Sequence, residues 1–158
     1  MRQLVGFPNP VNEKAARVVA AGVALAGALV LATGWQWLLV LLAYGFWARV
    51  LTGPKLSPLG RFATAVAASR LGEPRYVPGP PKRFAQTIGA VVTTVAAICA
   101  LAFGWTTAAA VLTALLVGFA LLESVFAFCV GCKVFAGLMA AGVIPEDVCA
   151  ECANIRAA

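Results

Sequence analysis

Residues 84–128 read FAQTIGAVVTTVAAICALAFGWTTAAAVLTALLVGFALLESVFAF, and this stretch decides the fold. It contains one charged residue, Glu123, between runs of apolar and small side chains. At 1.5 Å per residue, the runs 84–103 and 105–128 are each long enough to cross about 30 Å of hydrocarbon as helices. Glycine permits a tight turn and tryptophan favours the membrane–water boundary, so Gly104-Trp105 predicts the turn of a membrane hairpin.

The N-terminal half of the chain holds a second hairpin of the same kind. Residues 15–33 and 35–51 are apolar runs that meet at Gly34-Trp35, 70 residues before Gly104-Trp105. The same offset relates two pairs of prolines ahead of the hairpins, Pro8 with Pro78 and Pro10 with Pro80. We therefore expect an all-α, four-transmembrane-helix bundle of two pseudo-repeated helical hairpins. Similar apolar hairpins could also match by coincidence, because few side chains are identical.

Composition supports a lipid bilayer as the surroundings of the chain. Of its 158 residues, 62% are hydrophobic and 11% are charged, whereas soluble domains have about 25% charged residues. A soluble protein of this size needs a more polar surface. The net charge of +6 does not indicate nucleic acid, because the basic residues lie between the apolar runs and form no basic stripe.

The positive charges predict the orientation. Arg2, Lys14 and Arg17 lie at the N-terminus and the entry of the first run, and six Lys and Arg residues lie in the central loop 52–83, whereas the Gly-Trp turns carry none. Cytoplasmic loops carry the excess of Lys and Arg. We expect a multi-pass protein of the cell inner (plasma) membrane with both termini and the loop in the cytoplasm. The first run is interpreted as a retained span, because cleavage as a signal peptide would leave a chain starting in apolar sequence.

The central loop contains a candidate interfacial helix, Ser57–Leu71. Ser57 is a suitable N-cap and Pro58 fits the first turn. Its apolar side chains would face lipid while Arg61 and Arg70 reach phosphates. Docking of a partner protein is the alternative role for this helix.

Residues 1–128 thus form the predicted bundle, and residues 129–158 form a short cytoplasmic tail with four cysteines. The tail contains Cys129-Val-Gly-Cys132 and Cys149-Ala-Glu-Cys152, with 16 residues between the pairs. This spacing is typical of four-thiolate zinc sites, and structural disulfides are rare in the cytoplasm. The chain has no histidine, and Cys99 is most simply a small apolar side chain of the third span.

Local sequence predicts how the tail is arranged. We expect the fourth span to continue into Cys129 and Cys132, so that both lie on one face of the same helix. The apolar run then breaks at Gly142, and Pro145 begins a short helix that carries Cys149 and Cys152. A fold-back at Gly142 would bring the two pairs together.

Zinc binding is the function that the sequence favours for these cysteines, ahead of an iron–sulfur cluster and of redox chemistry. All four can bind zinc and stabilise a membrane scaffold or docking point in thiol or sulfur metabolism. An iron–sulfur cluster needs the same four ligands. Alternatively the chain is a thiol–disulfide oxidoreductase or sulfur-relay enzyme, with Cys129 and Cys132 as the working pair and Cys149 and Cys152 as the resolving pair. Lys133 favours the first pair as nucleophile, because a nearby cation lowers a thiol pKa.

Glu123 is a further candidate site residue, because acidic side chains within spans are functional candidates. It lies six residues before Cys129, about 9 Å along a helix. An ion pair with Arg17 or Arg49 is the structural interpretation, and a proton relay to the thiols is the functional one. No span carries a row of polar residues, so a small transporter is a weaker alternative.

Four stretches resemble the bacterial membrane family called domain of unknown function 4395. They are Phe7–Glu13, Gly53–Gly60, Val77–Gln86 and Cys129–Ile155. The resemblance implies a multi-span membrane protein without an assigned activity, and it supplies no catalytic residues. Members of that family lie near thioredoxin-like and sulfurtransferase genes, which implies a thioredoxin-like or sulfurtransferase partner.

Overall fold

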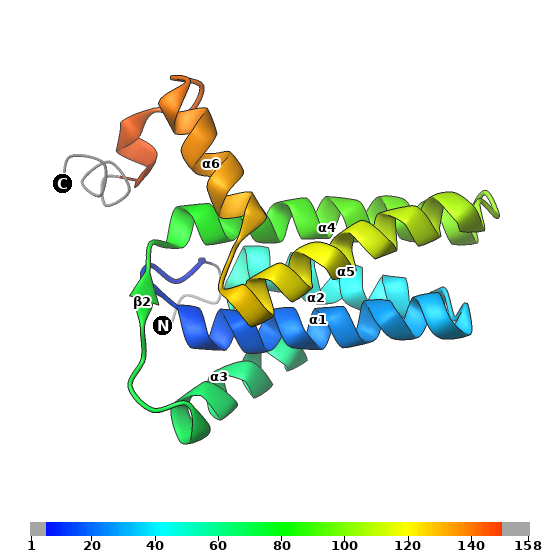
Figure 1. Ribbon diagram of the computed structural model, residues 1–158, viewed down its shortest axis with the longest axis horizontal. Helices are drawn as coiled ribbons and strands as arrows, with labels where there is room; N and C mark the ends of the chain where they lie inside the picture. Colours follow the sequence, from blue (N-terminus) through cyan, green and yellow to red (C-terminus); the bar gives the residue numbers. More distant parts are fainter. Residues whose placement is uncertain (1–5, 150–158) are drawn as a thin grey trace.

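The computed structural model describes residues 6–149, and its regular secondary structure is helical apart from one short strand pair (Figure 1). The helices are α1 Glu13–Thr33, α2 Trp37–Thr52, α3 Pro58–Arg70, α4 Gly79–Leu101, α5 Thr106–Phe126 and α6 Val130–Ala140. A 3₁₀ helix, η1 Glu146–Cys149, follows, and the strands are β1 Val11–Asn12 and β2 Tyr76–Val77. The predicted all-α class is confirmed.

Among the described residues, the three helices α1, α4 and α5 are long and apolar enough to cross a membrane. The predicted second span corresponds to α2, which is apolar but has 16 residues. A fourth crossing by α2 therefore stays a prediction. The predicted third span corresponds to α4, which begins at Gly79, five residues earlier than expected. Pro80 and Pro81 fall in its first turn, where their missing N–H groups cost no hydrogen bond.

Helices α1, α2, α4 and α5 pack in two pairs, and each pair joins one helix of the N-terminal hairpin to one helix of the C-terminal hairpin. In Figure 1, α1 lies along α5, and the contacts show that α2 lies along α4. Small residues allow close approach: a Cβ on Gly27 would lie 2.5 Å from Val117, and one on Gly89 would overlap the Phe46 ring. Helices that associate in lipid depend on such packing. Fifteen buried residues from α1 to α5 form one apolar core.

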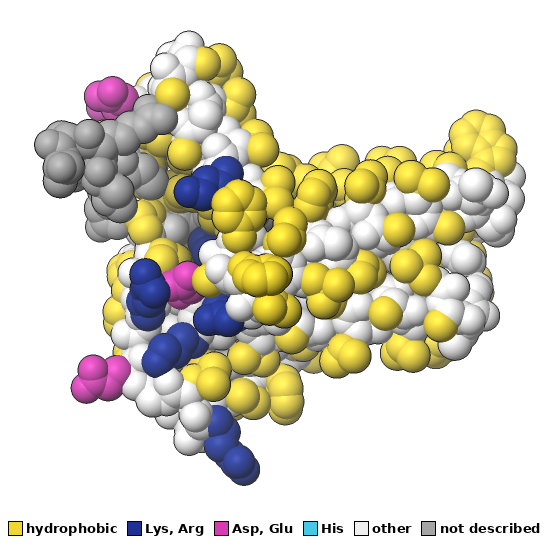
Figure 2. Space-filling view, viewed as in Figure 1, with side chains coloured by type: hydrophobic (Ala, Val, Ile, Leu, Met, Phe, Trp, Pro, Cys, Tyr) yellow, Lys and Arg dark blue, Asp and Glu magenta, His cyan; other side chains and the backbone are white. Residues whose placement is uncertain are grey.

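The outer faces of these helices are apolar as well. Leu25, Leu41 and Val125 are more than half exposed. Figure 2 shows hydrophobic side chains over the long shaft of helices, while Lys and Arg side chains gather at the end that carries the strands. This distribution is consistent with a lipid bilayer around the shaft.

The two hairpins begin side by side. Strands β1 and β2 pair antiparallel, with Val11 opposite Val77. The Asn9 side chain accepts a hydrogen bond from the Gly79 N–H at 2.9 Å. The contact fixes the N-terminal segment to the start of α4, and it places the starts of α1 and α4 at the same end of the molecule.

The helix predicted in the central loop is confirmed. Ser57 is the N-cap of α3 and accepts a hydrogen bond from the Gly60 N–H at 3.1 Å, and Pro58 is its first residue. Ala63 and Ala67 are buried where α3 crosses α1, and Phe62 is exposed. The expectation that apolar side chains of this helix, such as Phe62, face lipid stays a prediction.

Candidate dithiol site

The chain turns sharply between the last long helix and the first cysteine pair. Helix α5 ends at Phe126, and Ala127 takes a left-handed conformation with φ 56°. The N–H groups of Ala127 and Phe128 both point to the Leu122 carbonyl, which closes the end of the helix. The prediction that the fourth span continues into Cys129 and Cys132 is wrong. The two cysteines belong to a new helix, α6.

Cys129 is the N-cap of α6. Its backbone is extended, and its Sγ accepts a hydrogen bond from the Cys132 N–H at 3.4 Å. Cys129 is buried, whereas Cys132 is partly exposed, and both are free thiols. The start of a helix carries partial positive charge, and thiolates are stabilised there. The two sulfurs therefore have distinct surroundings although they lie one turn apart.

A close helix contact holds this pair in place. A Cβ on Gly131 would lie 2.5 Å from the Cβ of Ala85 and 2.7 Å from its Cα. Only a glycine lets the first turn of α6 approach α4 this closely. The sequence between the cysteines thus determines where the dithiol lies against the bundle.

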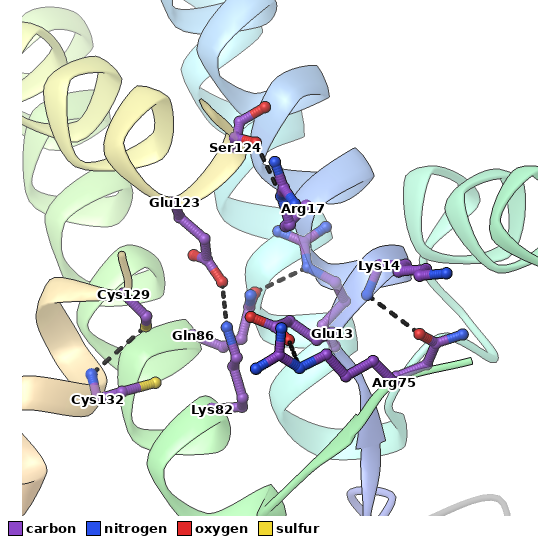
Figure 3. A network of polar contacts seen from close by, with 12 residues as sticks. Glu13, Lys14, Arg17, Arg75, Lys82, Gln86, Glu123, Ser124, Cys129 and Cys132 are labelled. Carbon is purple, nitrogen blue, oxygen red and sulfur yellow. Dashed lines mark hydrogen bonds and ion pairs between the residues drawn. The ribbon is translucent and has the colours of Figure 1, made fainter. Parts of the chain in front are cut away.

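A buried ion pair lies next to the thiols (Figure 3). The Lys82 Nζ lies 2.5 Å from a carboxylate oxygen of Glu123, with side chains 8% and 15% exposed. The expected pairing of Glu123 with Arg17 or Arg49 is wrong, because Lys82 in the first turn of α4 faces the last turn of α5. The sequence placed Lys82 among the basic residues of the central loop, at the entry of the third span, and did not indicate a partner for it. Its position two residues before the apolar run 84–103 was the available signal.

Arg17 and Arg49 bind other groups. Arg17 donates to the carbonyls of Ser124 and Val125 at 2.9 and 3.1 Å, which satisfies the carboxyl end of α5. Arg49 is buried, lies over the Phe46 ring, and donates from Nε to Gln86 at 2.8 Å. Its Nη1 donates to Ser57 at 3.0 Å. Both arginines therefore tie helices together.

The two thiols differ in acidity. The pKa of Cys129 lies below the ordinary thiol value, chiefly because the Cys132 thiol donates a hydrogen bond to it, and Lys82 also lowers it. The pKa of Cys132 is raised, first by the same hydrogen bond and then by burial. Lys133, expected to act on the thiols, is exposed and lies over the Phe128 ring, 5.8 Å from its centroid. The cation that assists Cys129 is Lys82.

A cavity of about 330 Å³ adjoins Cys129. Residues from α1, α2, α4, α5 and α6 line it, and apart from Cys129 its polar groups come from Gln86 and Glu123. Its apolar wall includes Val23, Phe46, Leu116 and Ala120. Sequence reasoning did not find this cavity, because it forms between helices far apart in the chain.

The second cysteine pair is described only in part. The predicted short helix is described only as the 3₁₀ helix η1, which begins after Pro145 and ends at Cys149. Cys149 packs against Phe135 and Met139. Cys149 is disulfide-bonded, and Cys152 lies outside residues 6–149. Within that range no three Cys, Asp or Glu side chains gather as a metal site. Zinc and the iron–sulfur cluster therefore stay predictions.

Within residues 6–149, fold and site together define a helical protein with three apolar helices of membrane-spanning length and a free dithiol at the start of α6. Residues 11–140 match the family model described as Domain of unknown function (DUF4395), and the chain belongs to this family. The matched range includes Cys129 and Cys132 and ends before Cys149. Neither a curated protein nor a solved structure matches the chain.

Proposed function

We propose that the chain is a membrane thiol–disulfide oxidoreductase whose working pair is Cys129 and Cys132. The observation that carries the proposal is the position of Cys129 as the N-cap of α6, with Cys132 one turn later and its N–H on the Cys129 sulfur. A dithiol at the start of a helix is suited to reversible disulfide chemistry, because the helix end stabilises one thiolate.

The proposal includes four spans, with α2 as the second crossing. The pairing of α1 with α5 and of α2 with α4 supports two repeated hairpins. In such a repeat α1 corresponds to α4 and α2 to α5, so the contact of α1 with α5 and the contact of α2 with α4 are equivalent. The Lys and Arg side chains at the strand-bearing end support a cytoplasmic location for that end and for the dithiol, in the plasma membrane.

The unequal exposure of the two sulfurs gives each a role. In the oxidised pair, a thiolate of a partner dithiol attacks the partly exposed Cys132 sulfur, the disulfide breaks, and Cys129 leaves as a thiolate. The lower pKa of Cys129 makes it the better leaving group. The second partner thiolate then attacks the partner's own sulfur in the mixed disulfide and releases Cys132. Two electrons and two protons pass from partner to pair.

The partner chemistry that fits is a thioredoxin-like or sulfurtransferase protein with an exposed reactive thiol. Zinc binding by the two CxxC pairs is the competing function, favoured by their spacing. A zinc-bound Cys129 and Cys132 would not exchange disulfides while the metal is present.

The test uses full-length reduced protein in lipid nanodiscs and a thioredoxin that lacks its second cysteine and whose remaining cysteine is activated as a mixed disulfide with thionitrobenzoate. Cys129→Ser keeps the accessible Cys132, whose thiolate attacks the thioredoxin sulfur and displaces thionitrobenzoate, so this variant is expected to trap a mixed disulfide with the probe. Cys132→Ser is expected to trap much less, and Cys99→Ser, in α4, serves as the control. Absence of any mixed disulfide, together with about one bound zinc per chain, would replace this function by the metal site.

A further inference from the structure

The buried sulfur of the pair faces a cavity that opens toward apolar surface. Cys129 is 7% exposed and lines the cavity next to Glu123. Exposed apolar side chains also line the cavity, and these mark its mouth: Leu115, Phe119 and Val134. A molecule that enters there arrives from the apolar surface of the bundle, so the reactant that reaches Cys129 by this route is lipid-soluble.

The cavity has an apolar body and a polar end. Its volume of about 330 Å³ is at the lower end of the roughly 300–1,000 Å³ typical of small-molecule sites. The Gln86 side-chain oxygen accepts from Arg49, so the amide N–H groups of Gln86 are the ones directed to other acceptors. A ligand carbonyl in the cavity can therefore meet the Gln86 amide donor in the same space that Cys129 lines.

On the basis of the proposed function, we propose that this cavity binds a lipid-soluble quinone that oxidises the Cys129–Cys132 dithiol. A lipid acyl chain would fill the apolar body but has no group for the polar end. A quinone has an apolar ring and carbonyl oxygens that accept hydrogen bonds, and it takes up two electrons. Partner proteins would then reach Cys132 from water, while the quinone reaches Cys129 from the bilayer.

The reaction balances without another reactant. The two S–H bonds of Cys129 and Cys132 break, and one S–S bond forms between the sulfurs. The quinone accepts the two electrons and two protons, and its two carbonyl groups become the two hydroxyl groups of the hydroquinone. The buried Lys82–Glu123 pair lies beside the thiols and can pass protons between them and the polar end of the cavity.

The experiment is anaerobic oxidation of the reduced full-length protein in nanodiscs by ubiquinone-1. We expect one hydroquinone for each disulfide formed between Cys129 and Cys132. Ala120→Phe fills the cavity wall and is expected to slow this reaction at least about tenfold. The matched control, Ala114→Phe, adds the same ring on α5 at an exposed position outside the cavity, and it is expected to react like the wild type.

A second cavity variant provides an independent test in case Ala120→Phe does not fold. Ala20→Leu narrows the cavity from α1, where Ala20 is buried. Exchange of either cavity variant with the thioredoxin probe shows that the dithiol is intact. If this exchange occurs but ubiquinone-1 is not reduced, or if Ala120→Phe and Ala114→Phe react alike, the quinone site is wrong and the oxidoreductase stands. If neither reaction occurs in the wild type, the oxidoreductase itself is wrong.

Discussion

Lys82, in the first turn of α4, forms an ion pair of 2.5 Å with Glu123, in the last turn of α5. The pair joins the start of one long helix to the end of the next, beside the only thiols at the α5–α6 junction among the described residues. Both side chains are largely buried, so each charge depends on the other.

Replacing one member of this ion pair should destabilise the protein. Glu123→Gln leaves the Lys82 ammonium buried without a carboxylate, which costs about 3 kcal/mol. Unfolding of the purified protein in mixed micelles measures the loss. The double variant Lys82→Met/Glu123→Gln should recover most of the stability, because no buried charge is left unpaired. A double variant as unstable as Glu123→Gln would contradict this explanation.

The acidity of Cys129 should depend on Cys132. The pKa of Cys129 is lowered mainly by the Cys132 thiol, so Cys132→Ala should raise it toward the ordinary value. The ultraviolet absorbance of the Cys129 thiolate measures this titration. It is obtained by subtracting the absorbance of the corresponding protein that carries Cys129→Ser. Because the folded-state pKa is lowered, the related stabilisation is present above the ordinary thiol pKa and is lost as pH falls through the lowered value. Equal titrations with and without Cys132 would rule out this cause.

The contact of α6 with α4 should tolerate no side chain at Gly131. Gly131→Ala places a methyl group against Ala85, and overpacking of this kind costs about 1–3 kcal/mol. Gly137→Ala is the matched control in the same helix, because nothing lies within 4 Å of its added Cβ. It should stabilise α6 by about 0.5–1 kcal/mol. Thermal unfolding measures the stability of both variants. A Gly131→Ala protein as stable as the wild type would show that the close contact of α6 with α4 is not required.

Metal content separates the two functions of the cysteines. Protein purified anaerobically without chelator should contain well below one zinc per chain if Cys129 and Cys132 form a working dithiol. Elemental analysis measures this, with Cys132→Ser as the control. Stoichiometric zinc that disappears in Cys132→Ser would instead support the four-thiolate site.

The helices were predictable because length and apolar character alone require them. Residues 84–103 and 105–128 correspond to α4 and α5 within a few residues. The end of α5 was not predictable, because its left-handed residue is Ala127, whereas glycine is the usual signal for this conformation. As a result, the sequence indicated the correct cysteines but placed them on the wrong helix.

The partner of Glu123 was missed for a different reason. Arg17 and Arg49 were expected at a similar depth, but depth does not determine which helix faces which. That choice follows from the packing of α4 against α5, which brings Lys82 to Glu123. The cavity beside Cys129 depends on the same packing, so neither feature follows from one segment of sequence.

The packing of each helix against a helix of the other hairpin also constrains biosynthesis. Because α1 packs along α5 and not mainly along α2, the first hairpin leaves the ribosome before its principal neighbour has been made. The Gly27 groove that receives Val117 stays uncovered until then. Strand β1 likewise waits for β2. The N-terminal hairpin therefore has to remain in the bilayer without its packing partners until the C-terminal hairpin has been synthesised. Insertion of the first hairpin then precedes packing of the two hairpins against each other.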